Sequence, residues 1–174
     1  SYMDSLKTYN DIRLMIEDYK DRKCKVYLLH GDLTEGQMSW LYQHDKIKAL
    51  VSISHGEGFG LPLYEAAALG LPVITVGWSG QCDFLIHPET PKLYTDIKYD
   101  MQPIDEKVTW EGVLEKGTYW AYADQGSYKM GLRNVKNNWN KVKKDAVKLQ
   151  KLINKKFNKE TLYENFCNAI HEPD

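Results

Sequence analysis

The stretch SHGEGFGLPLYEAAALGLPV, residues Ser54–Val73, decides the fold because it joins the end of one predicted strand to a glycine-rich loop and a helix. The preceding run, IKALVSIS, is rich in β-branched residues and predicts a buried strand. Pro62 suits the first turn of a helix, and Gly70 suits its C-terminal cap. The run LPVITV then predicts the next strand. Strand, helix and strand with connections this short predict parallel pairing.

The remainder of the chain alternates in the same manner and predicts an α/β fold, a Rossmann-like parallel sheet with flanking helices and further C-terminal helices. We expect the strands near Cys24–His30, Ala49–Ser54 and Pro72–Val76 to be parallel and adjacent, with the Gly56–Gly60 loop at their carboxyl edge. No linker or repeat interrupts residues 1–174, which predicts a single domain. The other expected elements are a helix over Asp4–Tyr19, a short helix capped by Thr34, one or two strands within Lys92–Ile104, an irregular aromatic segment over Asp105–Asp124, one long helix with an apolar stripe from Leu132 to Ile153, and a terminal helix over Lys159–Ile170.

Composition narrows the classes of function. The chain has 174 residues, 43% of them hydrophobic, and a formal net charge of −1, so no global field favours nucleic acid as a partner. Three widely spaced cysteines argue against a disulfide framework or a zinc site and favour a reducing, cytoplasmic compartment. No apolar run approaches the ~20 residues of a membrane span.

The glycine-rich loop leads into a helix start, where free amides and the helix dipole favour a phosphate. Its glycines are spaced G-x-G-x-G, which differs from the dinucleotide fingerprint, and it lacks the lysine of a P-loop. Two carboxylates, Glu57 and Glu65, suit the hydroxyls of a sugar or ribose instead. For Glu65 alone, a solvated glutamate in the first helical turn is an equal alternative. For His55, a loop histidine satisfied by backbone groups competes with a catalytic role.

The stretch from Val26 to Leu85, with SHGEGFGLPLYEAAALG at its centre, resembles the donor-binding half of the group 1, glycogen-synthase-like glycosyltransferases of GT-B fold. Their E-x7-E motif matches Glu57 and Glu65. The resemblance implies that Glu65 binds the ribose of a nucleotide-diphosphate sugar and that Glu57 is the catalytic residue beside the transferred sugar. It also implies transfer with retention, without a metal or cofactor, and no D-x-D motif occurs in the chain. The remaining donor contacts that it implies are the amides of Gly58, Phe59, Gly60 and Leu61, with Gly31 and Leu33 near the base.

Two features of the family pattern have no counterpart in this sequence: the acceptor-binding domain, and the glycine–arginine turn and lysine that neutralise the diphosphate. We therefore expect a donor-binding domain truncated at its N-terminus, inactive without its acceptor-binding partner domain. One alternative is a non-catalytic nucleotide-binding module. Another is a membrane-surface module, in which the lysine-rich helix Lys129–Lys156 makes peripheral contact with an anionic membrane. The competing interpretation of this helix is that it packs on the protein through its buried apolar stripe and exposes its lysines to water.

Overall fold

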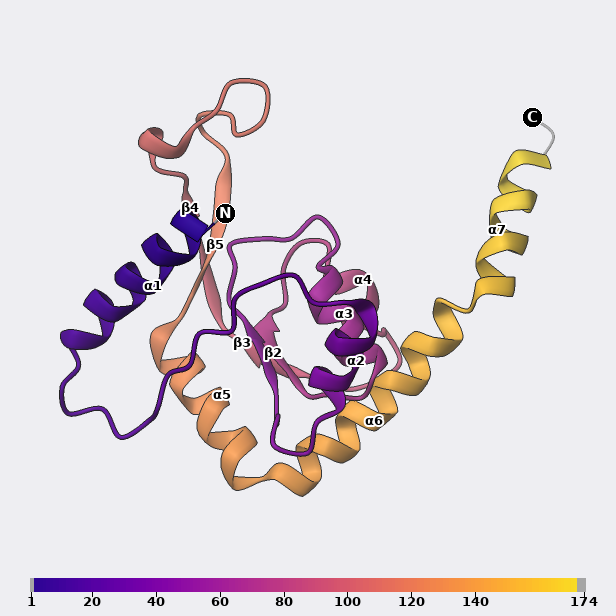
Figure 1. Cartoon of the computed structure of the whole chain (residues 1–174). Helices are drawn as coiled ribbons and strands as arrows, with labels where there is room; N and C mark the ends of the chain where they lie inside the picture. Colours follow the sequence, from indigo (N-terminus) through magenta and orange to yellow (C-terminus); the bar gives the residue numbers. More distant parts are fainter. Residues whose placement is uncertain (1, 172–174) are drawn as a thin grey trace. The chain divides into compact units, whose positions relative to one another are not determined.

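The structure is a computed structural model that describes residues 2–171. The chain divides into two compact units, Ser1–Gln37 and Met38–Asp174, and each is described by itself. Helix α2, Glu35–Gln43, begins in the first unit and ends in the second. Figure 1 shows a small sheet in the second unit with helices beside it.

The first unit contains helix α1, Tyr2–Glu17, which confirms the helix predicted near the N-terminus. The predicted cap of α2 is also confirmed. The Thr34 hydroxyl accepts a hydrogen bond from the Gln37 amide at 3.3 Å, and the Gln37 side chain accepts one from the Thr34 amide at 2.8 Å. This reciprocal pair satisfies two amides at the helix start.

The strand predicted over Cys24–His30 is wrong. These residues have no regular secondary structure, and Val26, Tyr27 and Leu29 are exposed. A β-rich composition shows only that side chains suit a pleated surface; a strand also needs a hydrogen-bonded neighbour. No other strand lies within the described residues of the first unit, so this segment has no neighbour there.

The second unit is built on a three-stranded sheet in the order β1-β2-β3, formed by Leu50–Ser52, Val73–Val76 and Thr95–Ile97. All neighbouring strands are parallel, which confirms the α/β fold and the pairing expected for the two strands around the glycine loop. Strand β2 is central and fully buried. Strand β1 lies at an edge and is only half-buried, in contrast to the buried strand predicted from its sequence.

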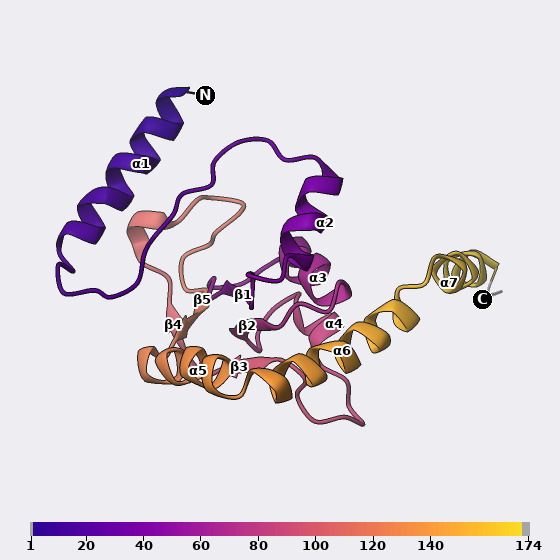
Figure 2. The same cartoon turned by 60° about the horizontal axis from the view of Figure 1, so that its bottom comes forward.

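The two faces of the sheet carry separate apolar clusters, since successive side chains of β2 point to opposite sides. Val73 packs with α3, α4 and α6, and Ile74 and Val76 pack against α5. Figures 1 and 2 show α5 and α6 meeting at a bend beside the sheet. The sheet is therefore covered by helices on both faces, as in Rossmann-like folds.

Helix α3, Leu61–Ala68, follows the glycine loop as predicted, with Pro62 in its first turn. It ends in a Schellman motif, in which the Gly70 amide donates to the Ala67 carbonyl and the Leu71 amide donates to the Ala66 carbonyl, both at 2.9 Å. Side chains of α6 bind the last free carbonyls, with Lys143 donating to that of Gly70 and Gln150 to that of Ala68. The C-terminal end of α3 is therefore fixed.

The segment predicted to be irregular contains a strand. After β3, strand β4 (Tyr99–Pro103) pairs antiparallel with β5 (Tyr119–Ala123), and a short 3₁₀ helix, Glu106–Val108, lies in the connection. The pairing of these strands joins residues that are far apart in sequence, so local patterns gave little sign of it. The two strands form a separate hairpin, which stands beside the parallel sheet in Figure 1.

The predicted single long helix is wrong in one respect, because the chain forms two helices, α5 (Gln125–Asn137) and α6 (Trp139–Lys156). Asn138, between them, has non-helical dihedrals, and its side chain donates to the Asn134 side chain at 2.7 Å. Asparagine competes for hydrogen bonds in this way and disfavours a helix interior. The apolar stripe from Leu132 to Ile153 nevertheless continues across the break at Asn138.

The remaining elements are the short helix α4, Cys82–Leu85, and the terminal helix α7, Lys159–His171. The apolar stripe of α6 is packed inside the protein, with Leu149 and Ile153 1% and 0% exposed. This favours the packed-helix alternative over contact of that stripe with a membrane. Within residues 2–171, no helix is long and apolar enough to span a bilayer.

We predict that Leu149→Ala lowers the free energy of unfolding by about 2–5 kcal/mol, because it removes a fully buried side chain. Leu132→Ala, on the same stripe but 38% exposed, serves as the control and is expected to lose roughly 1 kcal/mol or less. Urea denaturation followed by circular dichroism measures both. Equal losses would contradict the burial pattern of the stripe.

The loops that follow β1 and β2 are joined at the carboxyl edge of the sheet, where the glycine loop was expected. The Glu57 carbonyl accepts two hydrogen bonds, from the Ser79 hydroxyl at 2.8 Å and from the Gly80 amide at 2.9 Å. A side chain at Gly80 does not fit, since a Cβ there would lie 1.9 Å from the Gly58 carbonyl oxygen. The contact between the two loops therefore requires glycine at position 80.

Gly80→Ala is therefore expected to force the two loops apart and to cost about 1–3 kcal/mol of stability or more. The matched control is Gly58→Ala in the same loop, where a Cβ has no neighbour within 4 Å. Thermal unfolding of the two variants and the parent compares them. An alanine at Gly80 that is as stable as one at Gly58 would show that the loops are not held in this arrangement.

Candidate functional site

The glycine loop presents free backbone amides at the start of α3. Gly60, the residue before the helix, has a φ of 85°, a left-handed conformation that glycine adopts without strain. Phe59 directs its ring into a cluster with Tyr64, Phe84 and Phe157, at centroid distances of 5.1–5.9 Å. Within the described part of the chain, the amides of Gly58, Phe59 and Gly60 have no hydrogen-bond acceptor. Such a row of amides at a helix start suits an anion.

Glu57 is held in the middle of this loop. The Ser54 hydroxyl donates to its carboxylate at 2.8 Å, and the side chain is half-buried. A Cβ on Gly60 would lie 3.6 Å from both Cβ and Cγ of Glu57, so the stem of the glutamate passes directly beside that glycine. The carboxylate is thus positioned from both sides and keeps oxygen lone pairs for a ligand hydroxyl.

Glu65 lies on α3, one turn beyond the helix start, and is exposed. The pKa of Tyr42 is raised, mainly by burial of its phenol and in addition by the negative charge of Glu65. Glu65 is therefore near Tyr42 but is not buried by it. The two glutamates occupy different elements, with the free amides of the loop between them in sequence.

His55 is satisfied by backbone groups, in agreement with one of its two interpretations. Its Nδ1 lies 2.8 Å from the Ala121 carbonyl oxygen, and the Ala121 amide donates to the His55 carbonyl at 3.3 Å. The ring also stacks on Trp120, with centroids 4.9 Å apart and planes at 7°, and contacts Tyr122. His55 thereby connects the glycine loop to β5. Since Nδ1 donates to a carbonyl, Nε2 is the nitrogen left for other contacts.

A cavity of about 600 Å³ adjoins Glu57. No lysine or arginine lines it in the described structure, and aromatic rings form much of its surface. Sequence reasoning missed the part of the lining that comes from the hairpin. The alternating aromatic run TYWAYA was the available sign of a strand there. The lining residues are His55, Gly56, Glu57, Gly58, Trp78, Ser79, Leu114, Tyr119 and Trp120.

Gly31 and Leu33, expected near a nucleobase, belong to the first unit. The glycine loop belongs to the second unit. The expected role of Gly31 and Leu33 therefore stays a prediction.

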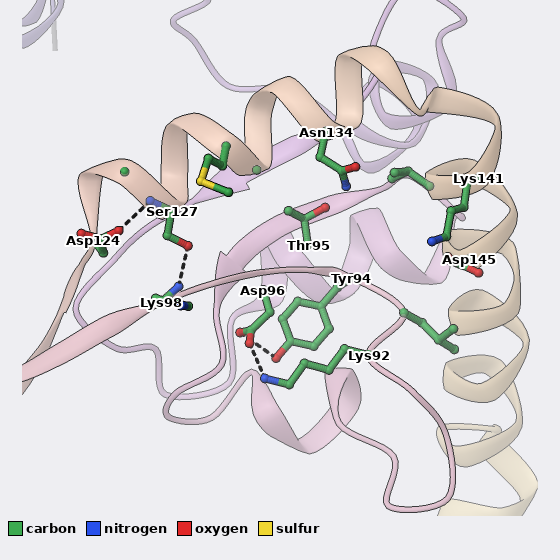
Figure 3. A pocket seen from close by; sticks show the side chains of 15 residues that line it. Lys92, Tyr94, Thr95, Asp96, Lys98, Asp124, Ser127, Asn134, Lys141 and Asp145 are labelled. Atoms are coloured by element: carbon green, nitrogen blue, oxygen red, sulfur yellow. Dashed lines mark hydrogen bonds and ion pairs between the residues drawn. The ribbon is translucent and has the colours of Figure 1, made fainter.

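A second cavity, of about 640 Å³, lies beside β3 and is lined by residues of α5 and α6 (Figure 3). Its three lysines are accompanied by three aspartates, and Lys92 already pairs with Asp96. The Tyr94 hydroxyl also donates to Asp96, and burial above all, together with that carboxylate, raises the pKa of Tyr94 well above its usual value. Asp124 caps the start of α5 by accepting from the Ser127 amide. With its charges balanced in this way, this cavity is a poorer anion site than the free amides of the glycine loop.

Among residues 2–171, no group of three or more histidine, cysteine, aspartate or glutamate side chains is arranged to hold a metal ion. The three cysteines are free thiols, with Cys24 and Cys167 exposed.

Comparison with known proteins agrees with this geometry. The model of the family described as glycosyl transferases group 1 matches residues 11–110, a span that contains both glutamates, the glycine loop and all three parallel strands. The matched region is the C-terminal, donor-binding domain of these GT-B enzymes. Searches of curated proteins and of solved structures gave no match. Because the family match covers more than half of its residues, the chain belongs to the group 1 glycosyl transferases, which implies transfer of a sugar from a nucleotide-sugar donor.

Proposed function

We propose that the chain binds a nucleotide-diphosphate sugar at the glycine loop and contributes Glu57 to a retaining transfer of the sugar, a hexosyl group, to an acceptor. The observation that carries the proposal is the row of free amides at the start of α3, with Glu57 fixed before it and Glu65 one turn beyond it. A diphosphate fits the amides, and hydroxyl groups on either side of the diphosphate fit the carboxylates.

In this arrangement the amides of Gly58, Phe59, Gly60 and Leu61 bind the diphosphate, and the dipole of α3 adds to their effect. The aromatic packing of Phe59 supports this role, since the contact of its ring with Phe84 and the apolar core holds the loop. Each amide is in place before the ligand arrives, so binding does not have to order the loop.

Glu65 binds a ribose hydroxyl, because an exposed carboxylate near the helix start can accept hydrogen bonds from the sugar next to the phosphates. Glu57 lies on the opposite side of the amides in sequence and is adjacent to the cavity. There it binds the transferred sugar, and its negative charge stabilises the positive charge that develops at the anomeric carbon. Gly31 and Leu33 are proposed to contact the base.

The diphosphate leaving group needs more positive charge than this cavity supplies. The described lining of the cavity contains no cationic side chain, and exposed helix dipoles contribute only about 0.3–1 kcal/mol. We infer that cationic contacts come from the glycine–arginine turn and lysine of the family's donor-binding domain, that the acceptor site comes from an acceptor-binding domain, and that the donor-binding chain by itself is inactive. Such a division places the reaction between two domains.

The two glutamates are expected to respond differently to substitution. Glu65→Ala should weaken binding of the nucleotide diphosphate by about 1.5–3 kcal/mol, the worth of hydrogen bonds to a charged group. Glu57→Ala should leave the nucleotide diphosphate nearly unaffected and weaken only the nucleotide sugar. Calorimetric titration of each variant with both ligands makes the comparison, with exposed Glu164→Ala as the control. Equal losses for both ligands in both variants would contradict the assignment.

Activity should depend on the acceptor-binding domain more than on any single side chain of this chain. We expect no transfer by this chain alone and measurable transfer when it is joined both to the family's glycine–arginine and lysine segment and to a group 1 acceptor-binding domain, in assays with a panel of nucleotide sugars. The anomeric configuration of the product, determined by NMR, tests retention. Efficient transfer by the chain alone, or an inverted product, would refute this part of the proposal.

A further inference from the structure

The β4–β5 hairpin places aromatic side chains next to the catalytic carboxylate proposed above. Tyr119 and Trp120 of β5 and Leu114 of the connecting segment line the 600 Å³ cavity together with Glu57. Trp78 lines it too, from the loop that follows β2. The cavity therefore combines one fixed carboxylate with several apolar rings from different parts of the chain.

These rings have different roles in the structure. Trp120 is occupied by its stack on His55, which holds the glycine loop against β5. Trp78 and Tyr119 are 37% and 57% exposed, and no hydrogen bond to another described residue uses the indole N–H or the phenol. The Trp78 Nε1 lies over the loop, 3.6 Å from the position that a Cβ on Gly56 would take. The Trp78 ring also contacts Tyr99, with centroids 6.3 Å apart, so Trp78 and Tyr119 are partly packed and keep exposed surface for a ligand.

This combination suits a pyranose ring. A pyranose has faces formed by C–H groups, which pack on aromatic rings, and a rim of hydroxyls, which carboxylates and indole N–H groups bind. A second phosphate is a poor fit, because the lining offers a carboxylate and no cation. A nucleobase would use the rings but leave Glu57 without a hydroxyl donor.

We propose that Tyr119 and Trp78 are specificity-determining residues that select the pyranose ring bound at Glu57. This inference rests on the proposed function and deepens it, since it assigns sugar selection to the hairpin and the β2 loop. The ring belongs either to the transferred sugar or to a saccharide acceptor. Both have the same chemistry at the cavity, and the experiment separates them.

The experiment titrates the full chain calorimetrically with UDP, GDP and ADP, with the glucose, galactose and mannose conjugates of each, and with methyl pyranosides. If the ring belongs to the donor sugar, Tyr119→Ala and Trp78→Ala should each lower the affinity for the nucleotide sugar by roughly three- to tenfold, the range for one aromatic contact. Affinity for the bare nucleotide diphosphate should stay within about twofold. If the ring belongs to a saccharide acceptor, the same two substitutions should lower the affinity for methyl pyranosides to the same extent. These titrations are made with and without nucleotide.

Controls distinguish lost ring contact from a damaged hairpin. Tyr119→Phe keeps the ring and should retain most of the sugar affinity. Trp110→Ala, in the same hairpin connection but outside the cavity lining, should behave as the parent. Failure of every nucleotide diphosphate to bind the parent chain would refute the proposed function, while the pyranoside titrations would still decide this inference. The inference about Tyr119 and Trp78 is overturned if the parent chain binds no sugar ligand. It is also overturned if Tyr119→Ala and Trp78→Ala bind every sugar ligand with the affinity of the parent.

Discussion

The two hydrogen bonds to the Glu57 carbonyl hold the site in place, since they join the loops after two adjacent parallel strands. Parallel strands bring their carboxyl ends to one edge of a sheet, but they do not determine how the loops at that edge are arranged. Here the hydroxyl of Ser79 and the amide of Gly80 fix the backbone of Glu57, which lines the cavity. The position of the Glu57 carboxylate therefore depends in part on hydrogen bonds made by the Glu57 backbone carbonyl and not by its side chain.

A second constraint acts from the opposite side. His55 is bound to Ala121 through both its ring and its backbone, so the hairpin is attached to the glycine loop at one residue. The cavity beside Glu57 is bordered by segments from the glycine loop, the β2 loop and the hairpin. None of these segments lines it alone. This explains why aromatic residues of β5, which lies outside the matched family region, border a site defined by a family motif.

Features set by neighbouring residues could be predicted from the sequence. Pro62, Gly70 and Thr34 each act within one helical turn, and each does in the structure what its residue type predicts. Features that need a distant partner could not. The composition of Cys24–His30 suits a strand but provides no neighbour, and the β4–β5 pairing joins segments separated by a long connection. In the site, the glutamates follow from a local motif, whereas the aromatic lining depends on long-range pairing.

The contact between His55 and Ala121 also bears on how the protein is made. The two residues are separated by 66 positions in the sequence. The glycine loop, α3 and all three strands of the parallel sheet are therefore synthesised before Ala121, whose carbonyl accepts the hydrogen bond from the His55 ring. Closing so long a segment carries an entropic cost that the later contacts must offset. The contact between His55 and Ala121 can form only after β5 has left the ribosome. A polypeptide released before that point would contain every residue of the family motif and lack the strand that holds it.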